Sequence, residues 1–256
     1  MEPFIKILNL QIPIYGVCWM SGIFLAAFIA LSLSKKTDVE KFDIVCSAVY
    51  AVIGGMIGSK LLFIVVTLRK IIEDKIPVEA VIKGGFVFYG GLIGGIIGLS
   101  IYTTIYKLKF LEFADIYACV LPLGHALGRV GCFVSGCCYG MPYNGAFGIV
   151  YTETLGGAPL GISIFPIQIL EALLLTVLFA VLLILFIRIN KKGIVAAIYL
   201  YSYSIIRFAL EFFRGDTERG SFMRLSTSQI ISIIILLILS VLILLRRKYI
   251  KKDTLL

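Results

Sequence analysis

Charged residues and histidine are what this chain has least of. Only 15% of its 256 residues are Asp, Glu, Lys or Arg, 60% are apolar, and there is one histidine. Since about a quarter of the residues of a soluble domain are charged, this scarcity excludes the ordinary soluble class. The Lys and Arg residues cluster at the ends of apolar runs, so the net charge of +9 predicts contact with membrane headgroups and no nucleic-acid partner.

The apolar residues form runs long enough to cross a bilayer, which takes about 20 residues per helix. Seven runs qualify: 13–33, 44–67, 85–106, 113–135, 165–188, 193–213 and 228–246. We therefore expect an all-α integral membrane protein with seven transmembrane helices, in which residues 1–256 form a single polytopic membrane domain. The segment Met1-Glu2-Pro3 lacks the basic start of a signal peptide, so we expect the first run to be retained.

Lys and Arg are divided unequally between the two sets of connections. Thirteen lie on one side: Lys35, Lys36, Lys41, Lys107, Lys109, Arg188, Lys191, Lys192, Arg246, Arg247, Lys248, Lys251 and Lys252. Eight lie on the other: Lys6, Arg69, Lys70, Lys75, Lys83, Arg214, Arg219 and Arg224. The positive-inside rule then predicts a cytoplasmic C-terminus and an N-terminus outside. The connection 136–164 becomes an extracytoplasmic loop, rich in turn formers, which fits a lid or an ordinary surface loop.

A few charged and polar residues lie inside the apolar runs, where each charge costs roughly 2.5–3.5 kcal/mol on insertion scales. Two sets have members four apart and so share a helical face: His125 with Arg129, and Tyr203 with Arg207 and Glu211. The glycines show the same spacing at Gly54/Gly58, at Gly90/Gly94/Gly98 and at Gly124/Gly128, which predicts closely packed helices.

The two intramembrane arginines indicate a bound anion. Arg207 and Glu211 can neutralise each other, but a pair of leucines would pack as well, so stability explains such a pair poorly. The runs hold no surplus of carboxylates, and arginine binds phosphate through a bidentate fork while staying charged. We therefore predict that Arg129 and Arg207 hold a lipid phosphate, with hydroxyl donors such as Tyr15 and Tyr203 beside it.

Seven short motifs occur in order along nearly the whole chain. They are 14–16 (IYG), 54–58 (GGMIG), 84–94 (GGFVFYGGLIG), 128–131 (GRVG) with Phe133, the set Pro166, Gln168 and Glu171, the stretch 203–214, and Gln229. Together they resemble the prolipoprotein diacylglyceryl transferase family. That resemblance implies a multi-pass enzyme of the bacterial plasma (inner) membrane without a cofactor. It would transfer the diacylglyceryl group of phosphatidylglycerol to the lipobox cysteine thiol of prolipoprotein signal peptides and release glycerol phosphate.

Two other functions stay open at this point. One is a paralogue that uses phosphatidylglycerol with a different acceptor. The other is a lipid or anion transporter, for which intramembrane Arg and Glu are equally natural. The seven runs show no internal repeat, whereas many transporters are built from duplicated halves.

The resemblance also assigns roles within the site. Arg129 and Arg207 are expected to hold the phosphate, with Glu211 orienting Arg207. The substrate-binding set is completed by Tyr15, Tyr203, Gln168, Glu171, Cys132 and Ser135.

The chain departs from the family at several of these positions. Tyr89 stands where the family has its proposed base histidine, Cys132 and Ser135 replace two asparagines, and Cys137 replaces a glutamate. A tyrosine with a pKa near ~10 is a poor base, so either Tyr89 or the single histidine, His125, is expected to help deprotonate the thiol. A purely hydrogen-bonding role for His125 is the alternative.

The six cysteines show no disulfide-framework spacing and are expected to be free thiols. The cluster Cys132, Cys137 and Cys138 contains no CxxC pair, and the chain has no second pair to complete four ligands, so we expect no metal site. A covalent relay through Cys137 or Cys132 is open, because thiolates are good nucleophiles. Simple replacement of polar residues by small cysteines is the competing interpretation.

Overall fold

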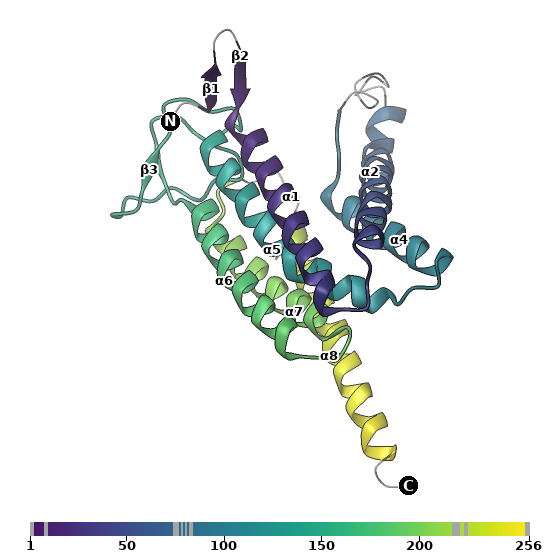
Figure 1. Cartoon of the computed structure of the whole chain (residues 1–256). Helices are drawn as coiled ribbons and strands as arrows, with labels where there is room; N and C mark the ends of the chain where they lie inside the picture. The colour runs from purple at the N-terminus through teal and green to yellow at the C-terminus, as the bar shows by residue number, and fades with distance from the viewer. Residues whose placement is uncertain are drawn as a thin grey trace. The chain divides into compact units, whose positions relative to one another are not determined.

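The structure is a computed structural model that describes residues 3–7, 10–73, 77, 79, 81, 84–216, 221–222 and 225–253. Within these residues seven helices are long and apolar enough to cross a membrane (Figure 1). They are α1 (Ile14–Leu33), α2 (Lys41–Ile72), α4 (Phe88–Ile105), α5 (Phe110–Ser135), α6 (Ile167–Arg188), α7 (Ile194–Leu210) and α8 (Thr227–Asp253). Each helix coincides with one expected run, which confirms the predicted class.

Short elements occupy the connections. They are the 3-10 turns η1 (Ser34–Lys36) and η2 (Glu211–Phe213), and three antiparallel pairs, β1 (Phe4–Ile7) with β2 (Leu10–Pro13), β3 (Ile149–Val150) with β4 (Ser163–Ile164), and β5 (Ser221–Phe222) with β6 (Leu225–Ser226). The pair β3–β4 lies in the 136–164 loop, which by sequence is rich in turn formers. The predicted orientation across the membrane stays a prediction, and of the cations behind it Lys75, Lys83, Arg219 and Arg224 lie outside the described residues.

The chain divides into two compact units, and the single domain expected from the sequence stays a prediction. The unit Leu31–Ala114 consists mainly of α2 and α4 packed against each other. Their glycines make this contact possible, because a Cβ at Gly54 would overlap the carbonyl of Gly94, and one at Gly58 would overlap the carbonyl of Gly90. The predicted close packing at these four glycines is therefore confirmed.

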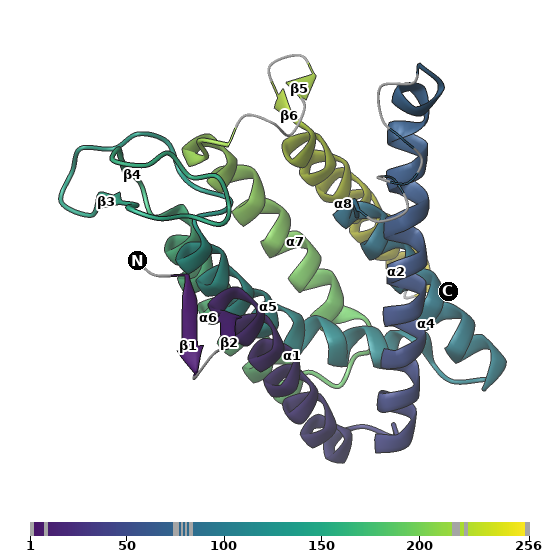
Figure 2. The ribbon, with the colours of Figure 1, turned by 90° about the horizontal axis from the view of Figure 1, so that it is seen from above.

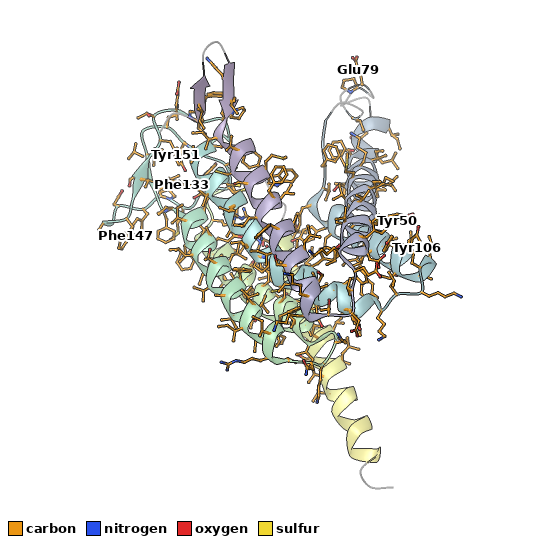
Figure 3. All side chains as sticks on the ribbon, viewed as in Figure 1. Tyr50, Glu79, Tyr106, Phe133, Phe147 and Tyr151 are labelled. Carbon is orange, nitrogen blue, oxygen red and sulfur yellow. The ribbon has the colours of Figure 1, made fainter. Side chains whose placement is uncertain are left out.

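Lys60, a charge inside the second span, is bound within this same unit. Its Nζ donates to the carbonyls of Val81 at 2.6 Å and Gly84 at 2.8 Å, and lies 5.2 Å from the centre of the Phe86 ring. Towards the start of α2, the ring centre of Tyr102 lies 5.1 Å from that of Tyr50 and 4.6 Å from that of Tyr106. Tyr50 and Tyr106 are close to each other in Figure 3.

The second unit, Met1–Ala30 with Asp115–Leu256, contains α1, most of α5, and α6 to α8 (Figure 2). Gly22 of α1 lies against Gly124 of α5, and α7 packs against both α6 and α8. Ala126 of α5 joins Ala172 and Leu175 of α6 in a small buried cluster. Tyr203 of α7 packs on the same cluster, so α5, α6 and α7 meet there.

Asp115, the acidic residue near the start of α5, ties that end of the helix to the start of α7. Its Oδ2 accepts the backbone N–H of Gly193 at 2.6 Å, and its Oδ1 accepts that of Ala196 at 2.8 Å. A carboxylate at a helix N-terminus satisfies donors that have no partner within the helix and is favoured by the helix dipole. Asp115 is thus a cap for α7, at the far end of α5 from Arg129.

Replacing Gly94 by alanine tests the glycine contact between α2 and α4. The added Cβ would overlap the Gly54 carbonyl, so we expect a loss of about 1–3 kcal/mol in unfolding free energy, measured in mixed micelles. Gly95→Ala is the matched control, since its Cβ meets only the Ala51 carbonyl at 3.4 Å. Equal stability of the two variants would contradict the packing argument.

Candidate functional site

A buried ion pair joins α5 to α6 at the centre of the second unit. Arg129 Nε lies 3.1 Å from Glu171 Oε1, and the Glu171 side chain is 1% exposed. The same Nε–H donates to His125 Nε2 at 3.1 Å, one turn earlier on α5. The Nε–H therefore points at the histidine, and Glu171 Oε1, although close, has no hydrogen bond of correct geometry among the described residues.

The free end of Arg129 takes no part in these two contacts, since both involve Nε. The two Nη groups form the outer edge of the fork that binds a carboxylate or a phosphate in the bidentate way. Arg129 is thus held through its inner nitrogen, and its contacts with Glu171 and His125 do not use the outer pair.

Arg207 is anchored in a similar manner on α7. Its Nη2 donates to Ser228 Oγ of α8 at 2.9 Å and lies 2.7 Å from Glu211 Oε2. Its Nη1 is buried and has no hydrogen-bond partner among the described residues. The predicted pairing of Arg207 with Glu211 is therefore present, and one donor of the guanidinium stays unfilled.

These contacts correct one premise taken from the sequence. Each arginine has its own carboxylate, Glu171 for Arg129 and Glu211 for Arg207, so charge balance by itself does not require an anion. The observation that still favours an anion is the buried Nη1 group of Arg207, because a buried donor without a partner costs free energy.

His125 bonds Arg129 and lies near Arg207. It donates nothing to Arg129 but accepts its Nε–H, and it lies within electrostatic range of Arg207 as well. Tyr203 of α7 places its ring edge-on to His125, with 5.5 Å between ring centres. The arginines that are 78 positions apart in the sequence thus both reach the surroundings of His125.

The turn after α5 is a Schellman motif that starts the 136–164 loop. Gly136, at φ +71°, donates to the Phe133 carbonyl at 3.2 Å, and Cys137 donates to the Cys132 carbonyl at 3.1 Å. The Ser135 carbonyl accepts the N–H groups of Leu155 at 3.0 Å and Gly156 at 2.9 Å. These bonds fix both the beginning and the later part of the loop to the end of α5.

Gln168 and Tyr151 hold the base of the same loop. Gln168 Nε2 donates to the Cys137 carbonyl at 2.9 Å. The Tyr151 hydroxyl donates to the Phe133 carbonyl, and the Tyr151 and Phe133 rings meet edge to face with their centres 6.4 Å apart (Figure 3). Burial raises the pKa of Tyr151 to about 12, so its hydroxyl stays protonated and remains a donor. Phe147, at the far tip, is 73% exposed and points away (Figure 3).

Two further residues lie near the site, Cys138 of the loop and Arg214 after η2. Neither was among the catalytic or substrate-binding residues predicted from the sequence. Arg214 binds Asp216 through two hydrogen bonds, Nε to Oδ1 at 2.8 Å and Nη2 to Oδ2 at 2.9 Å. It also lies within electrostatic range of Cys138, and its Nη1 is buried without a hydrogen-bond partner among the described residues. Hydrogen bonds with Cys132 and Cys137 lower the pKa of Cys138, and Arg129 and Arg214 act in the same direction.

The remaining residues predicted for the site lie at different places. Tyr15, at the start of α1, is within electrostatic range of Arg129 and the cysteine cluster, and it contacts Gly131. Ser135 is buried and its Oγ has no hydrogen-bond partner among the described residues. Tyr89 belongs to the other unit, in the first turn of α4 beside Phe88, so its part in the site stays a prediction.

Fold and site together define a seven-span integral membrane protein with a buried, arginine-lined polar site. The model of the family described as prolipoprotein diacylglyceryl transferase matches residues 3–245. Three similar proteins carry the name phosphatidylglycerol–prolipoprotein diacylglyceryl transferase. They are number 2 of Clostridium perfringens (34% identity over 91% of this chain and 90% of the relative), that of Clostridium tetani (34%, 93% and 95%) and that of Clostridioides difficile (31%, 88% and 87%).

The chain belongs to the prolipoprotein diacylglyceryl transferase family. The resemblance found in the short motifs is thereby confirmed, and the chain is a multi-pass membrane transferase.

Glu171→Gln tests the buried pair. The change leaves the Arg129 charge buried without its carboxylate, so we expect unfolding free energy to fall by about 3–5 kcal/mol, read from denaturation in micelles. Lys191→Gln is the control, because Lys191 is exposed in the connection between α6 and α7, and substitutions at exposed positions usually change stability by no more than about 0.5 kcal/mol. A Glu171→Gln protein as stable as the control would show that the carboxylate is not needed to compensate Arg129.

Proposed function

We propose that this chain, in the plasma membrane of a bacterium, transfers the diacylglyceryl group of phosphatidylglycerol to the lipobox cysteine of prolipoproteins. The names of its relatives support the lipid and the acceptor. The single observation in the site that carries the proposal is the pair of anchored arginines near His125, each with donors left unfilled by its carboxylate. A transporter is disfavoured, because the family matched over residues 3–245 is one of transferases.

The phosphate of the lipid is the group that these arginines fit. Arg129 is held at Nε and Arg207 at Nη2, so neither has to reorganise to present its remaining N–H groups. A phosphodiester bears one negative charge, and the departing glycerol phosphate gains a second. Donors already aimed at the place where charge develops stabilise the transition state more than the ground state.

The reaction is a displacement at carbon. The thiolate of the acceptor cysteine attacks the C3 carbon of the diacylglyceryl group, a C–S bond forms, and the C–O bond to phosphorus breaks. The electron pair of that bond leaves with glycerol phosphate, which Arg129 and Arg207 hold. Glu211 orients Arg207, and the Tyr203 and Tyr15 hydroxyls serve as donors to headgroup oxygens. Glu171 and Gln168 act indirectly: Glu171 positions Arg129, and Gln168 positions the loop through the Cys137 carbonyl.

The sequence left Tyr89 and His125 as candidates to take the thiol proton. A neutral His125 that accepts the Arg129 Nε–H at Nε2 carries its own hydrogen on Nδ1, so it has no free lone pair for another proton. In this arrangement His125 positions Arg129, and it becomes a base only after releasing the arginine. Tyr89 stays as the other proposed proton acceptor.

The loop 136–164 acts as a lid only through its outer part. Its base is fixed by the Ser135 carbonyl and by Gln168, whereas the segment around the exposed Phe147 has no such tether to α5 among the bonds described above. We propose that this tip contacts the lipid or the signal peptide.

Arg129→Ala and Arg207→Ala test the phosphate clamp. Each is expected to lower the transfer of labelled lipid to a lipobox peptide by about 10²–10³-fold, the effect of removing one preorganised donor group. Arg188→Ala is the matched control, because Arg188 is an exposed arginine in the last turn of α6. If both site variants transfer lipid as fast as the control, the clamp is wrong.

His125→Gln and His125→Leu separate positioning from base catalysis. If His125 positions Arg129, glutamine keeps an acceptor and lowers transfer by less than about tenfold, while leucine leaves the arginine unsatisfied and lowers it by about 10–100-fold. If His125 is the base, both variants lose about 10²–10⁴-fold. The initial rate of peptide lipidation at saturating lipid distinguishes the two patterns.

Complementation of a strain depleted of its own transferase tests the acceptor. Growth together with lipidated lipoproteins supports the proposal. Expression in the membrane without growth, combined with turnover of phosphatidylglycerol, would instead favour a different acceptor.

A further inference from the structure

The cysteine cluster is a built site that the mechanism above does not use. The Sγ atoms of Cys132, Cys137 and Cys138 lie within 4.8 Å of one another. Cys132 comes from the last turn of α5, and the other two come from the turn that follows. Cys132 is buried, while Cys137 and Cys138 are partly exposed, so the group is sheltered on one side and reachable on the other.

The backbone is held so that the three sulfurs converge. Cys138 has φ +57°, a left-handed conformation that costs a non-glycine residue about 1–3 kcal/mol and persists only where the surroundings impose it. The Cys137 carbonyl is held by Gln168, and Gly156 lies so close to Cys137 that a Cβ there would overlap it. The thiols are therefore preorganised by contacts from outside their own turn.

Three converging thiols are the ligand set of a thiophilic cation. With Zn–S bonds of ~2.3 Å, tetrahedral angles place neighbouring sulfurs about 3.8 Å apart, which is within the spacing seen here. The sequence argued against zinc because four protein ligands are missing. That objection applies to a structural site, whereas catalytic zinc has three protein ligands and an open fourth position.

The local charges tolerate a divalent cation. Arg129 and Arg214 lie within electrostatic range of the cluster, but each is paired with a carboxylate, Glu171 and Asp216, which compensates part of the positive charge that a divalent cation would meet there. The cluster also lies at the C-terminal end of α5, where the helix dipole favours a cation.

We propose that Cys132, Cys137 and Cys138 bind Zn²⁺ and that the open fourth position takes the thiol of the acceptor cysteine. This inference rests on the proposed function for its second half. A thiol that coordinates zinc is deprotonated outright, and its proton passes to water. The zinc-bound thiolate then forms the C–S bond as the C–O bond of the lipid breaks, and the thioether product dissociates because it is a neutral, weaker ligand.

Such a site resolves two features that the proposed mechanism leaves open. His125 has its Nε2 lone pair engaged by Arg129, so the second unit needs another way to generate the thiolate. The cluster lies within electrostatic range of Arg129, the residue proposed to hold the phosphate, so nucleophile and leaving group would meet in one place. A covalent relay through these cysteines is less suitable, since a thioether is a poor leaving group.

Metal binding is tested without any catalysis. The purified full chain in detergent, reduced and stripped with a chelator, is titrated with Co²⁺ as a coloured substitute for Zn²⁺. We expect one equivalent per chain with a sulfur-to-cobalt charge-transfer band, displaced by Zn²⁺. Cys132→Ser or Cys138→Ser should weaken binding by at least about 100-fold. Cys18→Ser/Cys46→Ser, which changes cysteines elsewhere, should bind like the unaltered chain.

Alkylation of the unaltered protein also tests whether the three cysteines bind the metal, and it needs no variant that could misfold. Bound Zn²⁺ should protect Cys132, Cys137 and Cys138 from iodoacetamide, as read by mass spectrometry, and leave Cys18 reactive. No Co²⁺ band and no protection, or equal Co²⁺ binding by the Cys138→Ser and control proteins, would overturn the site.

The role in activating the acceptor has its own outcomes. A lipobox peptide should change the Co²⁺ spectrum, whereas the same peptide with serine for cysteine should not, and Zn²⁺ removal should abolish transfer until zinc is restored. Full transfer by the stripped protein would overturn the activating role. A protein that binds the metal and the thiol peptide but transfers no lipid would keep the zinc site and refute the proposed function instead.

Discussion

One carboxylate, that of Glu171, decides where the polar centre of this membrane protein can form. It is buried on α6 and lies 3.1 Å from Arg129 of α5, so a charge that hydrocarbon would reject becomes tolerable only when the two helices are packed together. The small residues Ala126 and Ala172 lie at this junction and allow the close approach. The packing of α5 against α6 therefore also compensates the charge of Arg129, and it fixes the orientation of this side chain before a ligand binds.

The seven membrane spans were predictable from the sequence, and so were the pairs of side chains that lie one turn apart on the same helix. Composition and run length gave all seven helices, and the spacing of four anticipated both Arg129 beside His125 and Arg207 beside Glu211. The pairing of Arg129 with Glu171 of α6 could not be predicted in this way. The spacing of residues within one helix does not indicate which residue of a neighbouring helix will lie against it. The bonds from Gly193 and Ala196 to Asp115 are of the same kind, because they join residues of two helices that no spacing in the sequence connects.

The loop residues were the least predictable part. Gln168 and Ser135 were assigned to the substrate by resemblance, yet both also fix the loop, through the Cys137 carbonyl and the Ser135 carbonyl. Every residue has the same backbone carbonyl, so a hydrogen bond to a carbonyl cannot be recognised from the residue types in the sequence. The convergence of three sulfurs is of the same kind, since it follows from a turn at Gly136 and a left-handed Cys138 and not from regular spacing. The signal available beforehand was only that three cysteines occur within seven residues.

Arg207 and Arg214 each bury an Nη1 group that has no hydrogen-bond partner among the described residues, and this bears on how a product anion would leave. A buried donor without a partner costs free energy, so under the proposed function a departing phosphate would be best replaced directly by another anion. Turnover would then proceed by exchange, with the incoming lipid head displacing the product. Inorganic phosphate would slow the enzyme by occupying the same place.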